Sequence, residues 1–133
     1  MNPISIAMSG MQAASLRLNA SASNVANLRT NGRLPPAGGT SAAPAAYAPL
    51  RVDQVEVSGG GTAANVSTAS PSYTPSYDPT ASYADGNGMV AAPNVDLANE
   101  AVQQITAKYE FAASAAIMRA ASDMTKTLLD RTA

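Results

Sequence analysis

The positions of its helix-breaking residues constrain this chain more than any other feature of its sequence. Every proline except Pro3 lies between positions 35 and 93, and every glycine except Gly10 lies between positions 32 and 88. Proline lacks a backbone donor and glycine loses much conformational entropy on folding, so both are rare inside helices. The sequence therefore predicts two helical ends, residues 1–32 and 94–133, on either side of a non-helical middle, residues 33–93.

The N-terminal segment, 1–32, has an apolar row whose members alternate at spacings of four and three residues. Such a row is typical of a heptad-like seam that packs on a partner helix. Asn2 or Ser5 is expected to cap the start of this helix, because their side chains accept hydrogen bonds from free backbone N–H groups. The Asn31-Gly32 pair is expected to end it, since both residues tolerate the left-handed conformation. The row consists of Ile4, Met8, Met11, Ser15, Leu18, Ala22 and Val25.

The C-terminal segment, 94–133, has apolar residues on more than one side of its predicted helix. Asn94 or Asp96 is expected to cap this helix, and Glu100 lies where a negative charge interacts favourably with the helix dipole. A helix that is apolar on two sides needs more than one neighbour, so a two-helix hairpin would leave part of it uncovered. One row is Ala98, Ala101, Val102, Ile105, Tyr109, Ala112 and Ala116, and the second, about a third of a turn away, is Ile117, Ala121, Met124 and Leu128.

The middle segment, 33–93, alternates loop signals with short strand-forming stretches. Positions 34–49 are rich in proline, alanine, glycine and serine, which indicates an extended or flexible loop. A β-prone stretch over 47–57 ends at three consecutive glycines, and the turn signal at 85–88 leads into a second short stretch. The whole pattern predicts a mainly α fold. Long N- and C-terminal helices would pair as a coiled-coil-like bundle, with a small irregular β and loop region between them.

The core of such a fold is expected to be thin. Hydrophobic residues make up 46% of the sequence, but aromatic residues make up only 5%, and much of the apolar content is alanine. Burial contributes about 25 cal/mol per Å² of apolar surface, so each buried alanine stabilises the fold only a little. A lone monomer is therefore expected to be marginally stable, which indicates that the chain works with partners.

Charge and hydropathy exclude several classes of function. The net charge is -1 and the cations are scattered, so no basic face for nucleic-acid binding is predicted. No stretch approaches the roughly 20 apolar residues of a membrane span, so membrane insertion is not expected. No compact apolar block precedes Arg17, so we do not expect a cleaved signal peptide.

No catalytic, metal-binding or cofactor-binding residues are predicted. The chain has no histidine and no cysteine, which removes Ser-His and Cys-His nucleophiles and His/Cys metal sites. Asp96 and Glu100 are interpreted as helix-start residues instead of a carboxylate pair. The turn at 85–88 does not fit an EF-hand, and no lysine follows the glycines at 59–61 as in a phosphate-binding loop. The sequence therefore predicts a protein that is not an enzyme and uses no cofactor.

Two motifs lie on either side of the middle segment. The first runs LNASASNVAN over 18–27, followed by Thr30-Asn31-Gly32. It resembles the end of the first helix in the axial proteins of the bacterial flagellum, the family of rod and hook subunits. The second contains Tyr77-Asp78-Pro79, Ala84-Asp85, Pro93-Asn94-Val95 and Glu100. The order of these elements is similar to that in the proximal rod proteins of the family. The chain departs from the family pattern after Gly32, where Arg33-Leu34-Pro35 replaces the usual aromatic and basic residues.

The resemblance implies a structural subunit of the proximal rod in the flagellar basal body. Its terminal helices would polymerise into a drive shaft that transmits torque. It also implies export through the flagellar type III apparatus without a cleaved signal peptide, and a place in the periplasmic rod. The implied partners are copies of the chain, other flagellar rod proteins and neighbouring basal-body components.

We predict a subunit interface that combines the apolar rows of both helices with two asparagines of the first motif. Two alternatives stay open: another short rod subunit of the same family, and a soluble helical adaptor or export-associated binding module that holds a peptide along Met8 and Met11. Tyr73, Tyr77 and Tyr83 form either a contact surface or a small cluster beneath the loop. The predicted interface residues are Ile4, Met8, Met11, Leu18, Asn24, Val25, Asn27, Val102, Ile105, Tyr109, Ala112, Ala116, Ile117, Met124 and Leu128.

Overall fold

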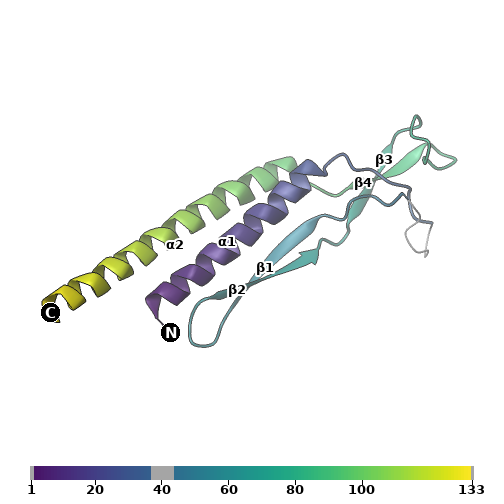
Figure 1. Cartoon of the computed structure of the whole chain (residues 1–133). Coiled ribbons are helices and arrows are strands. Elements are labelled where there is room, and N and C mark those ends of the chain that lie inside the picture. Colours follow the sequence, from purple (N-terminus) through teal and green to yellow (C-terminus); the bar gives the residue numbers. More distant parts are fainter. Residues whose placement is uncertain (1, 37–43, 133) are drawn as a thin grey trace.

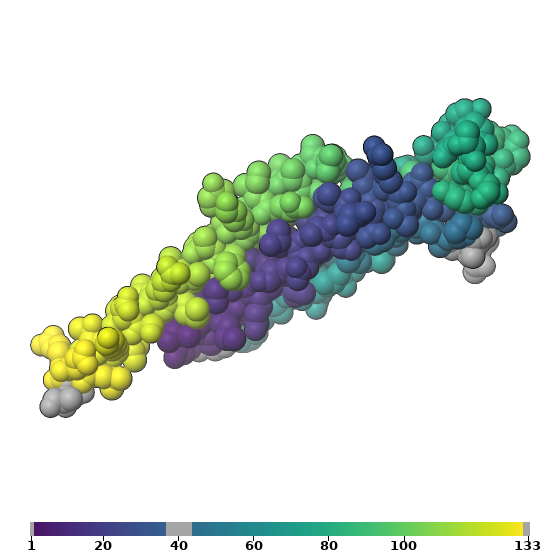
Figure 2. Space-filling view, turned by 45° about the horizontal axis from the view of Figure 1, so that its top comes forward, coloured from purple at the N-terminus to yellow at the C-terminus, as the bar shows by residue number. Residues whose placement is uncertain are grey.

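A computed structural model describes residues 2–36 and 44–132 and shows an elongated molecule built from two helices and two β-hairpins (Figure 1). The helices lie side by side and run in opposite directions. One hairpin lies along α1 on the side away from α2, and the other lies beyond the end of the helix pair (Figures 1 and 2). The elements in chain order are α1 (Pro3–Ala26), β1 (Leu50–Glu56), β2 (Thr62–Thr68), β3 (Tyr73–Tyr77), β4 (Met89–Pro93) and α2 (Leu97–Thr132).

Helix α1 begins as the sequence predicts and ends earlier. The Asn2 side chain accepts a hydrogen bond from the Ile4 backbone at 3.1 Å, which confirms Asn2 as the cap. The helix ends at Ala26, so the predicted end at Asn31-Gly32 is wrong. Asn27 is the C-terminal cap: its backbone N–H makes the last helical bond to the Ser23 carbonyl, and its side-chain amide donates to the same oxygen. Beyond it the backbone bonds span three residues, from Leu28 to Val25 and from Thr30 to Asn27, so the chain continues as a turn.

Helix α2 begins at Leu97, and Asp96 is its cap. The Asp96 carboxylate accepts hydrogen bonds from the backbone of Ala98 at 2.9 Å and of Asn99 at 3.4 Å. The other candidate cap, Asn94, instead donates its side-chain amide to the Pro71 carbonyl. Helix α2 has 36 residues and α1 has 24. At about 1.5 Å per residue, α2 is longer by about 18 Å, and its C-terminal part extends past the start of α1 (Figure 1).

Two antiparallel hairpins occupy the middle of the chain. Strands β1 and β2 pair with Val52 opposite Val66, and the glycines at 59–61 close their turn with φ angles of 92°, 97° and 100°. Only glycine adopts such angles without a steric cost. Strands β3 and β4 pair with Tyr77 opposite Met89. The predicted turn before β4 is present, because the Gly88 N–H donates to the Asp85 carbonyl at 3.0 Å.

The predicted mainly α, coiled-coil-like fold class is wrong. The structure is 48% helical and 20% strand, and the strands form two ordered antiparallel sheets where a small irregular region was expected. The physical reason is that the glycine turn lets two seven-residue strands pair fully and pack on α1. The Thr62 N–H donates to the Ser9 hydroxyl at 3.1 Å, which attaches this hairpin to the helix. Part of the loop predicted over 34–49 lies outside the described residues.

The buried core consists almost entirely of small residues. Among the described residues, Val90 is the largest side chain that is fully buried. Small side chains also recur every seven residues where the helices meet, which lets their backbones approach closely. A Cβ placed on Gly10 would lie only 2.7 Å from the Ser114 hydroxyl oxygen. The buried hydrophobic residues are Ala7, Ala13, Ala14, Ala20, Val90, Ala91, Ala107 and Ala121.

Replacement of Gly10 by valine is expected to push the helices apart and destabilise the fold by about 1–3 kcal/mol, because the extra methyl groups have no space beside Ser114. Alanine should be better tolerated, since the Ser114 hydroxyl can rotate away. Gly86→Val is the matched control, because a Cβ at Gly86 meets no atom within 4 Å. Chemical denaturation of the full chain measures the difference, and equal stability of the two valine variants would contradict the close approach.

Candidate subunit interface

The largest apolar side chains of α2 lie on its outer surface. The large side chains of the two predicted rows of α2 are between 56% and 69% exposed, and Ala112 and Ala116 are exposed as well. Exposed apolar patches of this kind mark contact surfaces for other molecules. These side chains are Val102, Ile105, Tyr109, Ile117, Met124 and Leu128.

The outer position of this row follows from which residues of α2 face α1. The facing positions recur every seven residues at Glu100, Ala107, Ser114 and Ala121. Tyr109 follows Ala107 by two positions, which rotates it by about 200° around the helix. The first apolar row of α2 therefore points away from α1, and a small, partly polar row forms the contact between the helices.

The predicted interface residues of α1 are divided between exposed and buried positions. Met8 and Leu18 are exposed, whereas Ile4, Met11 and Val25 are half-buried. The structure does not bring these residues against the first apolar row of α2, which lies on the far side of its helix. The predicted apolar rows of the two helices therefore do not contact each other within the chain, and their contact with other subunits stays a prediction.

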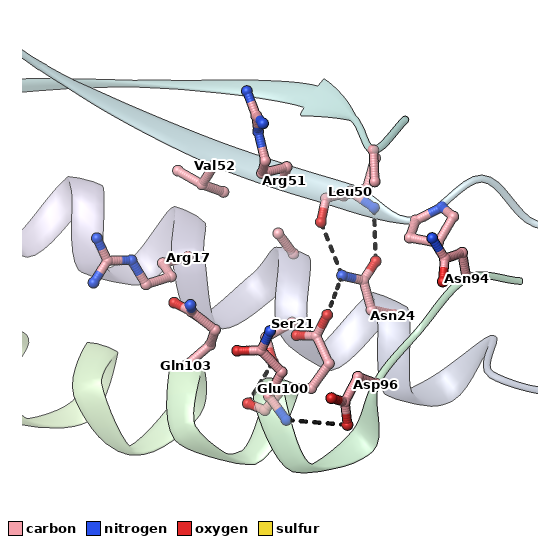
Figure 3. Close-up of a pocket in the computed structure, with 14 residues that line it drawn as sticks. Arg17, Ser21, Asn24, Leu50, Arg51, Val52, Asn94, Asp96, Glu100 and Gln103 are labelled. Carbon is pink, nitrogen blue, oxygen red and sulfur yellow. Dashed lines mark hydrogen bonds between the residues drawn. The ribbon is translucent and has the colours of Figure 1, made fainter. Parts of the chain in front are cut away.

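Asn24 is the polar anchor of the fold, and it joins three elements (Figure 3). It is 2% exposed. Its amide nitrogen donates to the Leu50 carbonyl at 2.8 Å and to the Glu100 carboxylate at 2.7 Å. Its oxygen accepts from the Leu50 N–H at 2.7 Å and from the Tyr47 hydroxyl at 3.0 Å. One side chain in α1 thus fixes the register of β1 and the start of α2.

Two more polar contacts extend this junction along the helix pair. The Ser21 hydroxyl, on the residue one turn before Asn24, donates to the Glu100 carbonyl at 3.1 Å. Further along, Arg17 forms an ion pair with Glu110 at 2.8 Å. The sequence analysis placed Ser21, Asn24 and Asn27 in one motif, but it did not predict the contacts of Ser21 with Glu100, of Asn24 with Tyr47 or of Arg17 with Glu110. The seven-residue spacing of Ala7, Ala14 and Ser21 was the available signal.

A polar cavity of about 410 Å³ lies beside this junction, between α1, α2 and β1 (Figure 3). Its acidic side chains already have partners, because Asp96 caps α2 and Glu100 binds Asn24. Arg17 on its wall is paired with Glu110. The described residues contain no group of three or more acidic, cysteine or histidine side chains arranged to hold a metal ion.

The three tyrosines of the middle segment have different environments. Tyr77 on β3 is 70% exposed, whereas Tyr73 and Tyr83 are half-buried. Tyr83 lies beside Leu34 and Pro35 on the wall of a shallow depression near the tip of the β3–β4 hairpin. In the described part of the chain, no helix is long and apolar enough to cross a membrane.

Comparison with known families matches the two ends of the chain. Residues 4–32 match the family described as flagella basal body rod protein, and residues 87–131 match the family described as flagellar basal body rod FlgEFG protein C-terminal. No curated protein matches the chain. The first match covers α1 and the turn after it, and the second covers most of α2 together with β4.

These two matches cover the paired helices, and they identify the family of the chain. The chain belongs to the flagellar basal body rod family. It is therefore a structural and non-enzymatic protein of the flagellar basal body, which assembles with other flagellar rod components. The two segments that match are also the two segments that pack on each other in the fold.

Replacement of Asn24 by leucine is expected to destabilise the chain by about 1–3 kcal/mol, because the backbone N–H and carbonyl of the half-buried Leu50 lose their hydrogen-bond partner. Asn19→Leu on the exposed face of α1 is the matched control and should change stability by less than about 0.5 kcal/mol. Thermal unfolding of the full chain measures both.

Asn24→Asp is expected to destabilise the fold mainly by electrostatic repulsion. The substitution removes the donor and places a second carboxylate beside Glu100. Glu100→Gln in the same chain should restore part of the stability, because an amide can donate to the new carboxylate. If Glu100→Gln restores no stability, the hydrogen bond between residues 24 and 100 does not contribute to the stability of the fold.

Proposed function

We propose that this chain is a subunit of the proximal rod and polymerises through the outer faces of α1 and α2 to form the torque-transmitting shaft. The observation that supports this most is the uneven placement of apolar side chains. Small and polar residues hold α1 against α2, while Val102, Ile105 and Tyr109 remain exposed. Burial of each such side chain stabilises a contact by about 1.5–3 kcal/mol. Assembly can therefore gain the free energy of burying side chains that the isolated fold leaves exposed.

The extension of α2 past α1 supports the same proposal. Met124, Leu128 and Leu129, near the C-terminal end of α2, are between 61% and 66% exposed, and this end of α2 extends past the start of α1 (Figure 1). A soluble helical adaptor with one peptide groove would not need apolar residues on several sides of its longest helix. A shaft subunit that contacts several neighbours does need them.

The assignment to the proximal rod, and to FlgC within it, rests on the order of the second sequence motif. Tyr77-Asp78-Pro79, Ala84-Asp85 and Pro93-Asn94-Val95 follow the order of that protein. Another short rod subunit of the same family is the alternative. Imaging of isolated basal bodies with the chain labelled distinguishes the two, because a FlgC-like subunit should be in the proximal part of the rod.

Export through the flagellar type III apparatus without a cleaved signal peptide is part of this proposal. The thin alanine core supports it, because a chain with little buried apolar area is easily kept unfolded during passage. Secretion of the full chain from cells with and without a working export apparatus tests this route. The mass of the secreted chain shows whether its N-terminus remains intact.

Replacement of exposed apolar residues on α2 by aspartate is expected to abolish swimming and leave the monomer intact. Ile117→Asp and Met124→Asp change side chains that are 56% and 61% exposed, so monomer stability should change by less than about 0.5 kcal/mol. Val55→Asp on β1, which is 49% exposed, is the control outside the helices and should swim. Normal swimming by both helix variants would refute assembly through α2.

Assembly is also expected to increase the helix content of the chain. A marginal core predicts that the dilute monomer has less helix than the assembled form, because isolated helices are weakly stable in water. Circular dichroism of the full chain over a range of concentrations, with and without other rod proteins, measures the change. A helix content that is the same at every concentration, with and without other rod proteins, would contradict this expectation.

A further inference from the structure

Two apolar surfaces lie uncovered on different sides of the helix pair. The first, the apolar groove, is a shallow depression of about 470 Å³, lined by Met8, Met11, Gln12, Ser15 and Leu16 of α1 and by Phe111 of α2. The second, the outer ridge, is formed by Val102, Ile105 and Tyr109 of α2. Nothing within the described residues covers either surface.

The groove and the ridge face in different directions. Phe111 borders the groove, and Tyr109 on the ridge precedes it by two residues, which is about 200° around α2. One molecule therefore cannot place its own ridge in its own groove. A contact between the two surfaces requires two molecules. Because the surfaces differ, the contact is heterologous and leaves a free groove and a free ridge at the ends.

Charge does not oppose contact between these surfaces. In α1 the single charged residue is Arg17, which is paired with Glu110. Between Leu97 and Ile117 of α2, the acidic residues Glu100 and Glu110 both bind α1. Lys108 is the one other charged residue between Leu97 and Ile117. The ridge can enter the groove without removing a charged pair from water, which is otherwise a large cost.

The shapes of the side chains also match. Val102, Ile105 and Tyr109 are spaced at i, i+3 and i+7, the pattern by which a helix places anchors in an apolar groove. Met8 and Met11 are unbranched and flexible, so they can adjust to the side chains that enter. Gln12 and Ser15 are the polar members of the groove, and both can hydrogen-bond at the rim.

We propose that the outer ridge of one copy of this chain docks in the apolar groove of a second copy. This proposal rests on the proposed function, because it names the faces by which a shaft subunit meets its neighbour. Each copy gives one ridge and receives another. A repeated contact of this kind builds a ring if its rotation closes and an open helical array if it does not, and the shaft of the proposed function requires the open array.

Disulfide cross-linking tests the contact directly, because the natural chain has no cysteine. The variant Met11→Cys, Ile105→Cys is expressed in cells that lack the natural copy, and their basal bodies are isolated and oxidised. We expect a ladder of this chain that extends beyond the dimer. Each single variant alone should give no homodimer, and a mixture of the two single variants should give dimers only.

Several results would overturn the proposal. Homodimers of either single variant would show a symmetric contact. Cross-linking to another rod protein alone would show that the occupant is not a second copy. Asn65→Cys, exposed on β2, is the control that should not cross-link with Ile105→Cys. Cells that swim without producing the ladder would retain the proposed function and refute this contact.

A charge pair keeps the proposal testable if cysteines impair assembly. Met11→Glu and Ile105→Lys are each expected to abolish swimming, because each would bury one charge against an apolar side chain. The two substitutions together should restore swimming, because they meet across the contact in neighbouring copies. Failure of the double variant to swim better than either single variant would overturn the proposed docking.

Discussion

The helices α1 and α2 lie close together because small side chains occupy the seam between them. Ala7 and Ala14 in α1 and Ala107 and Ala121 in α2 are all buried, and Gly10 leaves room for Ser114. Close backbones leave no space in the seam for large apolar residues. The large residues of both helices therefore lie on other faces, and this arrangement produces the surfaces through which a rod protein meets its neighbours.

A small seam supplies little free energy of its own, so polar contacts fix the register of the elements. Asn24 uses both its donor and its acceptor atoms, and every one of its partners lies in another segment of the chain. A fully satisfied buried amide tolerates only one relative position of its neighbours. Asn24 thus determines how β1 and the start of α2 sit on α1, while the apolar surface stays available outside.

The sequence predicted local features better than tertiary packing. Asn2 and Asp96 were recognisable as caps because their side-chain chemistry acts within a few residues. The glycines at 59–61 and the turn before β4 were visible for the same reason. The two helices pair as predicted, but the pattern of large apolar residues did not identify the faces by which they meet, because that pattern marks only the most hydrophobic faces. In this chain those faces point away from the seam, and the seven-residue spacing of the alanine and serine positions in the seam is a weaker signal than the rows of large apolar residues.

The strands show a second limit of sequence patterns. The stretch around β1 was recognisable by its valines, but its partner β2 contains only Val66 as a large apolar residue. Much of the sheet depends on backbone hydrogen bonds and on contacts with α1, which a pattern of side chains does not reveal. The mainly α prediction failed for this reason.

The unequal lengths of the helices have a mechanical meaning for a shaft. Because α2 runs on beyond the start of α1, the two helices of one subunit do not finish at the same height (Figure 1). In the proposed rod, the long helix of each subunit would overlap the next subunit along the shaft, so the ends of neighbouring helices would lie at different heights. Any cross-section would then cut through unbroken helices, so twisting strain would have no flat seam along which to shear.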